Sequence, residues 1–210
     1  MKYLKDGWLI LVLALVFASG LTAVQSALAP KIAQNKKDKT YHRIPMLMLG
    51  VEEAEGLSVE EAAEGSPVVA YRVSQDGEVI GFVLEGSGGG YADKITTLVG
   101  LSADGATITG VSVVKQMETP NLGSKITGEW ADQYSGKTAD PPLEAVAGAV
   151  NLGDNQIDAI TGATISSVCL TKIVNNTVAQ FLDAQATLEW IADEEDKADD
   201  LSEEENEHAE

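Results

Sequence analysis

The segment DAITGATISS, Asp158 to Ser167, concentrates side chains that could do chemistry. Four of its residues carry hydroxyl groups, and the helical pattern that follows places the segment at a helix N-terminus. The first turn of a helix has unpaired backbone N–H groups and the positive end of the helix dipole, which favour a phosphate. Thr164 lies within this turn, and Gly162 and Ala163 keep side-chain bulk away from it. The segment is therefore suited to receive a phosphate group.

An ordinary capped helix would use the same residue types. Thr and Ser are favoured N-cap residues, and Thr161, Thr164, Ser166 and Ser167 are all suitable caps. The segment is not a P-loop, because no Gly-Lys-Ser/Thr follows it. A threonine hydroxyl is a weak nucleophile, and no His or Lys lies in the segment to take its proton.

Composition excludes several other kinds of site. The chain has 210 residues, enough for one domain of ordinary size, and its net charge is −19. Its 33 acidic and 14 basic residues argue against a nucleic-acid partner, because phosphate contacts need clustered Lys and Arg. Cys169 is the single cysteine, which excludes an intrachain disulfide and a cysteine-cluster metal site. With only His42 and His208 besides, we expect no metal centre built by this chain.

The N-terminal segment predicts a membrane anchor. No charge occurs from Gly7 to Pro30, a length that can cross a hydrocarbon core of roughly 30 Å. A cleaved signal peptide is the alternative, because Lys2 and Lys5 form a basic start and Ala27-Leu28-Ala29 resembles a cleavage site. Four lysines follow the segment, at 31, 36, 37 and 39, and local charge alone would place that side in the cytoplasm. A long downstream domain can nevertheless cross the membrane regardless of such charges.

The body of the chain predicts an antiparallel sheet covered by a helix. Two β-rich pairs surround Asp76-Gly77 and Asp104-Gly105, as in hairpins, and the apolar alternation slips at Gly110, which indicates a bulge. The glycine-rich run 86–91 is interpreted as a flexible loop between the hairpins. A helical apolar stripe should pack on the sheet; it comprises Leu170, Ile173, Val174, Thr177, Val178, Phe181 and Leu182. The acidic C-terminus is too polar and too uniformly charged to fold.

Several motifs together resemble the FMN-binding domain family. DAITGAT, 158–164, resembles the family's flavinylation motif D-x-x-[S/T]-G-A-T. METPNLGSKI, 117–126, resembles its E-T-P-G-L-G segment, and it follows a strand pair, VGLSADGATITGV, that is also similar to the family's. QYSGK, 133–137, matches a further short piece. The resemblance covers roughly residues 68–182, with the motifs in the family's order.

The resemblance implies a covalent flavin. The last threonine of the family's motif carries FMN through a phosphoester bond, which here would be Thr164, and a magnesium-dependent flavin transferase that uses FAD would attach it. Asp158 would then be a transferase-recognition residue rather than a turn carboxylate. The family also implies the residues that line the flavin: Glu118, Thr119, Leu122, Gly123, Thr161, Gly162 and Ala163. The chain departs from the family at Asn121, where glycine is usual, although Asn tolerates a left-handed backbone better than most residues.

The expected fold class is α+β: a transmembrane helix followed by one FMN-binding domain with an antiparallel sheet and packed helices. We expect an anchor at 1–30, a linker into the domain at 31–67, the FMN-binding domain at 68–188 and a disordered acidic tail at 189–210. Among its relatives, the chain is most similar to the G subunit of Rnf electron-transport complexes, with a longer relative in the C subunit of the sodium-translocating NADH:quinone reductase.

That similarity implies an electron-carrying flavoprotein subunit with no catalytic residue of its own. It would act beside other membrane subunits in a complex that couples ferredoxin and NAD electron transfer to Na⁺ or H⁺ movement. It also implies a single-pass protein of the inner membrane with a cytoplasmic N-terminus and an FMN domain outside the cytoplasm. Two alternatives remain open: an anchored flavoprotein reductase outside such a complex, and a non-redox anchored binding module in which the TGAT turn only caps a helix.

Overall fold

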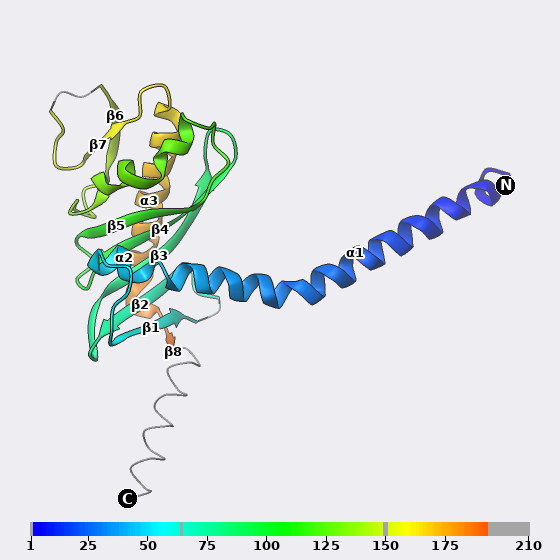
Figure 1. Cartoon of the computed structure of the whole chain (residues 1–210), viewed down its shortest axis with the longest axis horizontal. Coiled ribbons are helices and arrows are strands. Elements are labelled where there is room, and N and C mark those ends of the chain that lie inside the picture. Colours follow the sequence, from blue (N-terminus) through cyan, green and yellow to red (C-terminus); the bar gives the residue numbers. More distant parts are fainter. Residues whose placement is uncertain (1, 64, 149–150, 193–210) are drawn as a thin grey trace, which may run out of the picture. The chain divides into compact units, whose positions relative to one another are not determined.

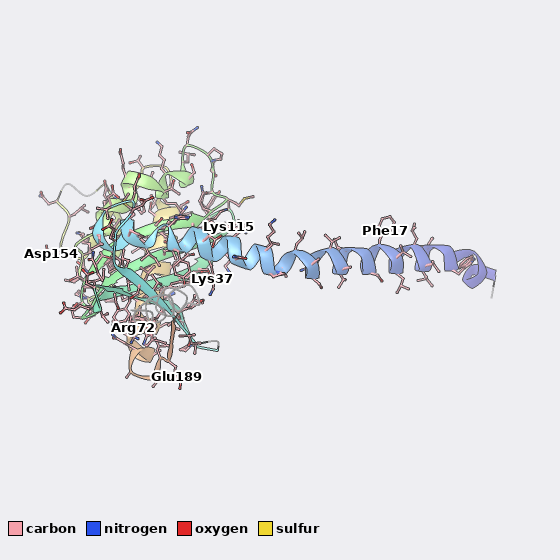
Figure 2. All side chains as sticks on the ribbon, turned by 60° about the horizontal axis from the view of Figure 1, so that its bottom comes forward. Phe17, Lys37, Arg72, Lys115, Asp154 and Glu189 are labelled. Carbon is pink, nitrogen blue, oxygen red and sulfur yellow. The ribbon has the colours of Figure 1, made fainter. Side chains whose placement is uncertain are left out.

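The computed structural model describes residues 2–63, 65–148 and 151–192. The chain divides into two compact units, Met1–Tyr41 and His42–Glu210. The first unit is a single helix, α1 (Lys2–Tyr41), which by length and composition could cross a membrane. It continues past the predicted anchor boundary at Pro30, which lies inside the helix. Its apolar side chains, such as that of Phe17, are exposed along its length (Figure 2).

The second unit is built on a six-stranded antiparallel sheet in the order β5-β4-β3-β2-β1-β8 (Figure 1). The strands are β1 (Leu57–Ala62), β2 (Val69–Gln75), β3 (Glu78–Gly89), β4 (Lys94–Ser102), β5 (Ile108–Lys115) and β8 (Trp190–Ala192). The helix α3 (Thr164–Ala184) packs against β3 and β4. The α+β fold class expected from the sequence is confirmed.

Smaller elements complete this unit. They are α2 (Ile44–Leu49), the 3₁₀ helices η1 (Gly123–Ile126), η2 (Gly128–Tyr134) and η3 (Gln185–Thr187), and the parallel pair β6 (Glu144–Ala147) and β7 (Gln156–Ala159). In Figure 1, β6 and β7 lie at the end of the unit where α3 begins. The elements that carry the sequence motifs therefore gather at one end of α3.

Both predicted hairpins form, for local reasons. Asp76 and Gly77 have φ values of 52° and 83° and make a two-residue turn between β2 and β3, the left-handed geometry that Asp-Gly favours. In the second hairpin, Gly100 pairs with Gly110 while Leu101 pairs with Ile108, so Thr109 is an extra residue. This is the predicted bulge, and because of it both Ile108 and Val111 reach the core.

The glycine-rich run was expected to be a flexible loop, and this expectation is wrong. Residues 86–89 form the end of β3 and pair with β4 from Thr97 to Lys94. The glycines are required by packing, because a Cβ on Gly86 would collide with Thr177 Oγ1 and one on Gly88 would lie 2.7 Å from Ile173 Cγ1. The absence of side chains at Gly86 and Gly88 lets α3 pack close to the sheet. The sequence pattern alone does not show that α3 lies there.

The predicted helical stripe forms the core, with one exception. Leu170, Ile173, Val174, Thr177, Val178 and Phe181 are buried. Leu182 is 40% exposed and lies near the C-terminal end of α3, close to Gly105. The apolar periodicity therefore overestimates the buried face by one residue at the C-terminal end.

The sheet extends beyond the predicted domain range 68–188 at both ends. Strand β1 lies in the stretch expected to be a linker, and β8 lies in the stretch expected to be a disordered tail. Trp190 of β8 stacks on Phe82 with ring centroids 5.7 Å apart, and the guanidinium of Arg72 lies over its ring. The tail beyond the sheet, 193–210, lies outside the described residues.

Candidate functional site

The TGAT segment forms a tight turn between β7 and α3. The Ala163 N–H donates to the Ile160 carbonyl at 2.8 Å, and Gly162 has a φ of +82°, a left-handed value that favours glycine. Burial of Ile157 and Ala163 fixes the turn to the core. Thr164 is the first residue of α3, and its side chain is exposed. The sequence expectation of a helix N-terminus at Thr164 is therefore confirmed.

The four hydroxyls of the segment have different surroundings. Ser167 Oγ accepts the Ile160 N–H at 3.0 Å and donates to the Ala163 carbonyl at 3.1 Å, so it closes the turn from inside. Ser166 is buried and donates to a carboxylate, and Thr161 is exposed. The N-cap residue, Ala163, has no side chain able to cap. Within the described part of the chain, the Thr164 hydroxyl has no hydrogen-bond partner.

A buried carboxylate joins the two main motifs. Glu118 is only 4% exposed, and its Oε2 accepts the Ser166 hydroxyl at 2.5 Å. Its Oε1 accepts the Ala92 N–H at 3.0 Å. Ser166 lies in the first turn of α3, and Ala92 follows the glycine-rich end of β3. The Glu118 cluster, meaning Glu118, Ser166 and Ala92, therefore holds three separate segments of the chain together beside the TGAT turn.

Two glycines leave room for this cluster. A Cβ on Gly123 would lie 2.6 Å from Ser166 Oγ and 2.9 Å from Glu118 Cβ, and one on Gly90 would collide with Glu118 Oε1. Sequence reasoning did not identify Gly90, Ala92 or Ser166 as site residues. The glycine-rich run and Ser166, which follows the TGAT segment, were the available signals, but the sequence does not show that they meet at Glu118.

The METPNLGSKI segment turns at Asn121, as the sequence suggested. Asn121 has a φ of +60°, and its N–H donates to Ser124 Oγ at 3.0 Å. The Thr119 carbonyl accepts the N–H groups of Leu122 and Ser124 at 3.2 and 3.1 Å. Leu122 is 44% exposed, and its Cδ2 lies 3.5 Å from the point that a Cβ on Gly162 would occupy. Asn therefore adopts the left-handed turn, and the turn places Leu122 against the TGAT segment.

The backbone of Asp158 is held by two side chains of η2. Gln133 Oε1 accepts the Asp158 N–H at 2.9 Å, and Trp130 Nε1 donates to the Asp158 carbonyl at 2.8 Å. The Asp158 side chain itself is exposed, and no partner for its carboxylate occurs among the described residues. A role as a capping or turn carboxylate therefore has no support in the geometry. Trp130 was not anticipated from the sequence, whereas Gln133 belongs to the QYSGK match.

The residues expected to line a flavin divide into two groups by exposure. Thr119, Leu122, Thr161, Gly162 and Thr164 are exposed, whereas Glu118, Gly123 and Ala163 are buried. Three hollows lie elsewhere: about 950 Å³ between α2, β5 and η2, about 500 Å³ along residues 87–94, and about 420 Å³ beside α3 and β3. Thr164 lines none of them. The exposed residues lie outside these hollows, and the approach of Leu122 to Gly162 joins those of the two motifs into one surface beside Thr164.

The 3₁₀ helix η2 is held against α3 by a buried tyrosine. Tyr134 is fully buried, and its hydroxyl lies 2.7 Å from Thr171 Oγ1 in the second turn of α3. Burial raises the pKa of Tyr134 well above its ordinary value, so the phenol remains protonated at any physiological pH. Trp130 packs edge-on against the same ring. The helix that carries Thr164 and the η2 residues that hold Asp158 are thus parts of one packed assembly.

The chain is similar in sequence to known proteins. The model of the FMN-binding domain matches residues 90–179. The G subunit of the Na⁺-translocating ferredoxin:NAD⁺ oxidoreductase complex of Acetobacterium woodii is 44% identical over 109 residues, which are 51% of this chain and 52% of that relative. This chain thus aligns with about half of that relative's length. The G subunit of the ion-translocating oxidoreductase complex of Methanosarcina acetivorans is 34% identical over 169 residues, 80% of this chain and 86% of the relative.

A solved structure shares the fold. The crystal structure of the C subunit of the Na⁺-translocating NADH-quinone reductase from Parabacteroides distasonis superposes with a TM-score of 0.58 at 17% sequence identity. The match covers 73% of this chain and 94% of that chain. At this identity the likeness concerns the fold alone.

Proposed function

Because the chain belongs to the FMN-binding domain family, we propose that Thr164 carries FMN through a phosphoester bond and that the domain passes electrons within a membrane complex. The observation that supports attachment most directly is the Thr164 hydroxyl. It is exposed, it has no partner in the described part of the chain, and it lies at the N-terminus of the 21-residue helix α3. A phosphate at this position faces unpaired N–H groups and the positive end of the dipole.

Loading of Thr164 is a group transfer from FAD. The Thr164 oxygen attacks the phosphorus on the FMN side, an oxygen–phosphorus bond forms, the pyrophosphate bond breaks and AMP leaves. The hydroxyl proton must go to a base on a separate flavin transferase, because the TGAT segment holds no His or Lys. The exposed carboxylate of Asp158, with its backbone fixed by η2, supports its assignment as a recognition residue for that enzyme.

The bound FMN supplies the redox chemistry, and the protein supplies binding and orientation. The exposed residues Thr119, Leu122, Thr161 and Gly162 would face the flavin. The buried residues Glu118, Gly123 and Ala163 would act by fixing the position of that surface, so Glu118 is a positioning residue. No side chain of this chain is proposed to be catalytic.

We extend the proposal to a membrane complex because of what the relatives belong to. Both curated relatives are subunits of ion-translocating oxidoreductase complexes, and one is named for Na⁺ and for ferredoxin and NAD⁺. The chain would therefore be an electron-carrying subunit beside other membrane subunits, coupled to Na⁺ or H⁺ movement. The helix α1 would be its single membrane span, with the N-terminus in the cytoplasm and the FMN domain outside.

The test of attachment is Thr164→Val, with Thr164→Ser as the matched variant that keeps a hydroxyl. Each full chain is co-produced with a flavin transferase, and covalent flavin is measured by in-gel fluorescence after denaturation and by intact mass. We expect covalent flavin in the wild type and the serine variant and none in the valine variant. Because the Thr164 side chain does not cap the helix, the free energy of unfolding of the valine variant should lie within about 0.5 kcal/mol of the wild-type value.

Two outcomes would contradict this proposal. Covalent flavin in the valine variant would place the attachment elsewhere. Absence of covalent flavin from the wild type in the presence of the transferase would favour a non-redox anchored module in which the TGAT turn is only structural.

A further inference from the structure

The part of the chain around α1 carries a net positive charge, whereas the rest is strongly acidic. Residues 2–43 hold seven of the 14 basic residues and only two acidic ones. Residues 44–210 hold the other seven basic residues and 31 acidic ones, a net charge of −24. Four of the basic residues, Lys31, Lys36, Lys37 and Lys39, lie within nine positions directly after the uncharged run that ends at Pro30. We name these four residues the lysine collar.

The helix places the lysine collar at the level of lipid headgroups. The uncharged run of 24 residues spans about 36 Å at about 1.5 Å per residue, which is enough for a hydrocarbon core of roughly 30 Å. The helix α1 continues without a break through Pro30 to Tyr41. When the uncharged run occupies the hydrocarbon core, the collar occupies about the next 12 Å along the helix, which is the headgroup layer and the first Debye length of about 8 Å above it.

The collar residues surround the helix. At about 100° per residue, Lys31, Lys39, Lys36 and Lys37 lie at about 0°, 80°, 140° and 240° around the axis, so no gap between them exceeds about 120°. Lys31, Lys37 and Lys39 are exposed, and Lys37 is labelled on α1 in Figure 2. A protein partner would contact one face of the helix, whereas lipids contact every side of it. The arrangement therefore fits an annulus of lipid better than a protein interface.

We propose that the lysine collar binds the anionic headgroups of phospholipids around α1. Each lysine close to an anionic surface strengthens binding on the order of fivefold. The collar would hold anionic lipid at the point where an acidic domain of charge −24 leaves the membrane, and its charge would offset the repulsion between that domain and the lipid surface. It also gives these lysines a role that does not depend on which side of the membrane they occupy. The inference requires α1 to span a bilayer, but it does not require FMN at Thr164.

The test uses the full chain in nanodiscs of phosphatidylcholine with a minority of phosphatidylglycerol. Spin-labelled forms of the two lipids report which one is held at the protein surface, through the fraction of label whose motion is restricted. We expect the wild type to prefer phosphatidylglycerol roughly fivefold at low salt, and we expect the preference to fall towards one at high salt. Both faces of a nanodisc are accessible, so membrane orientation does not affect the result.

Variants distinguish an effect of the lysine collar from an effect of the total charge of the chain. Replacing Lys31, Lys36 and Lys39 by Gln should remove most of the preference, and replacing the same three by Arg should keep it. The control replaces Lys94, Lys115 and Lys172 by Gln, which changes the charge equally but outside α1, and it should leave the preference unchanged. The inference is overturned if the collar and control variants behave alike, or if the wild type shows no preference. A preference lost equally in the Arg variant would also overturn it, because that result would show a dependence on something other than charge.

Discussion

Replacing Glu118 by alanine is the sharpest test of how the site is held together. The substitution removes the carboxylate that accepts the Ser166 hydroxyl at 2.5 Å and the Ala92 N–H at 3.0 Å. It disconnects the first turn of α3 from the METPNLGSKI segment and from the end of β3. Because Thr164 and Leu122 belong to two of these segments, the surface around the Thr164 hydroxyl should lose its fixed shape.

The size of the effect follows from the burial of the two donors. Ser166 is 2% exposed, so its hydroxyl would lose its acceptor in a place that water does not reach, at a cost of about 1–3 kcal/mol. Ala92 is exposed, so water can replace part of the bond to its N–H. Relief of the desolvated Glu118 carboxylate offsets some of the loss. We expect a net destabilisation of about 1–3 kcal/mol, or roughly 2–12 °C in the melting temperature of a domain of this size.

Glu118→Gln is the matched variant, because it keeps the shape and removes the charge. The amide oxygen can accept the Ala92 N–H, and the amide NH₂ can donate to Ser166 Oγ once that hydroxyl rotates. We therefore expect a loss below about 1 kcal/mol. In the flavin-loaded chains, the fluorescence anisotropy of the flavin should fall in the alanine variant and stay near the wild-type value in the glutamine variant.

Thermal unfolding followed by circular dichroism, together with flavin anisotropy, checks these expectations. Equal melting temperatures for the wild type and Glu118→Ala would refute the idea that Glu118 holds the three segments together. If Gln proved as damaging as Ala, the hydrogen-bond argument would fail, and the charge itself would be the important property. Unchanged anisotropy in a destabilised alanine variant would restrict the role of Glu118 to stability.

Two further expectations concern packing. Gly123→Ala places a methyl group 2.6 Å from Ser166 Oγ and should lower the free energy of unfolding, measured by chemical denaturation, by about 1–3 kcal/mol. In the control, Gly153→Ala, the nearest neighbour is 3.5 Å away, so the free energy of unfolding should change by less than about 1 kcal/mol. Equal effects would contradict the steric argument. Trp190→Ala should cost about 2 kcal/mol through lost stacking on Phe82, and a chain ending at residue 188 should melt lower than one ending at 192. Equal melting of those two truncations would show that β8 adds nothing to the sheet.

Features with local causes were predictable from the sequence. The turn at Asp76-Gly77 follows from the left-handed conformation that these two residues tolerate, and the bulge before Gly110 follows from a slip in apolar alternation. The helix start at Thr164 follows from a turn of small and hydroxyl-bearing residues before an apolar stripe. In each case the deciding interactions join residues a few positions apart, so the local pattern contains the information.

The tertiary structure decided which residues meet. Glu118 is joined to Ala92, 26 positions earlier, and to Ser166, 48 positions later, and Gln133 pairs with Asp158 across 25 positions. The glycine-rich end of β3 has the composition of a loop, but it pairs with β4 as a strand, and its glycines at 86 and 88 leave room for the closely packed α3. The helix start that carries Thr164, the residue proposed to hold FMN, could thus be identified from the sequence, because it depends on one turn. The residues that hold that turn could not, because burial and chain-distant hydrogen bonds exist only once the sheet, η2 and α3 have packed together.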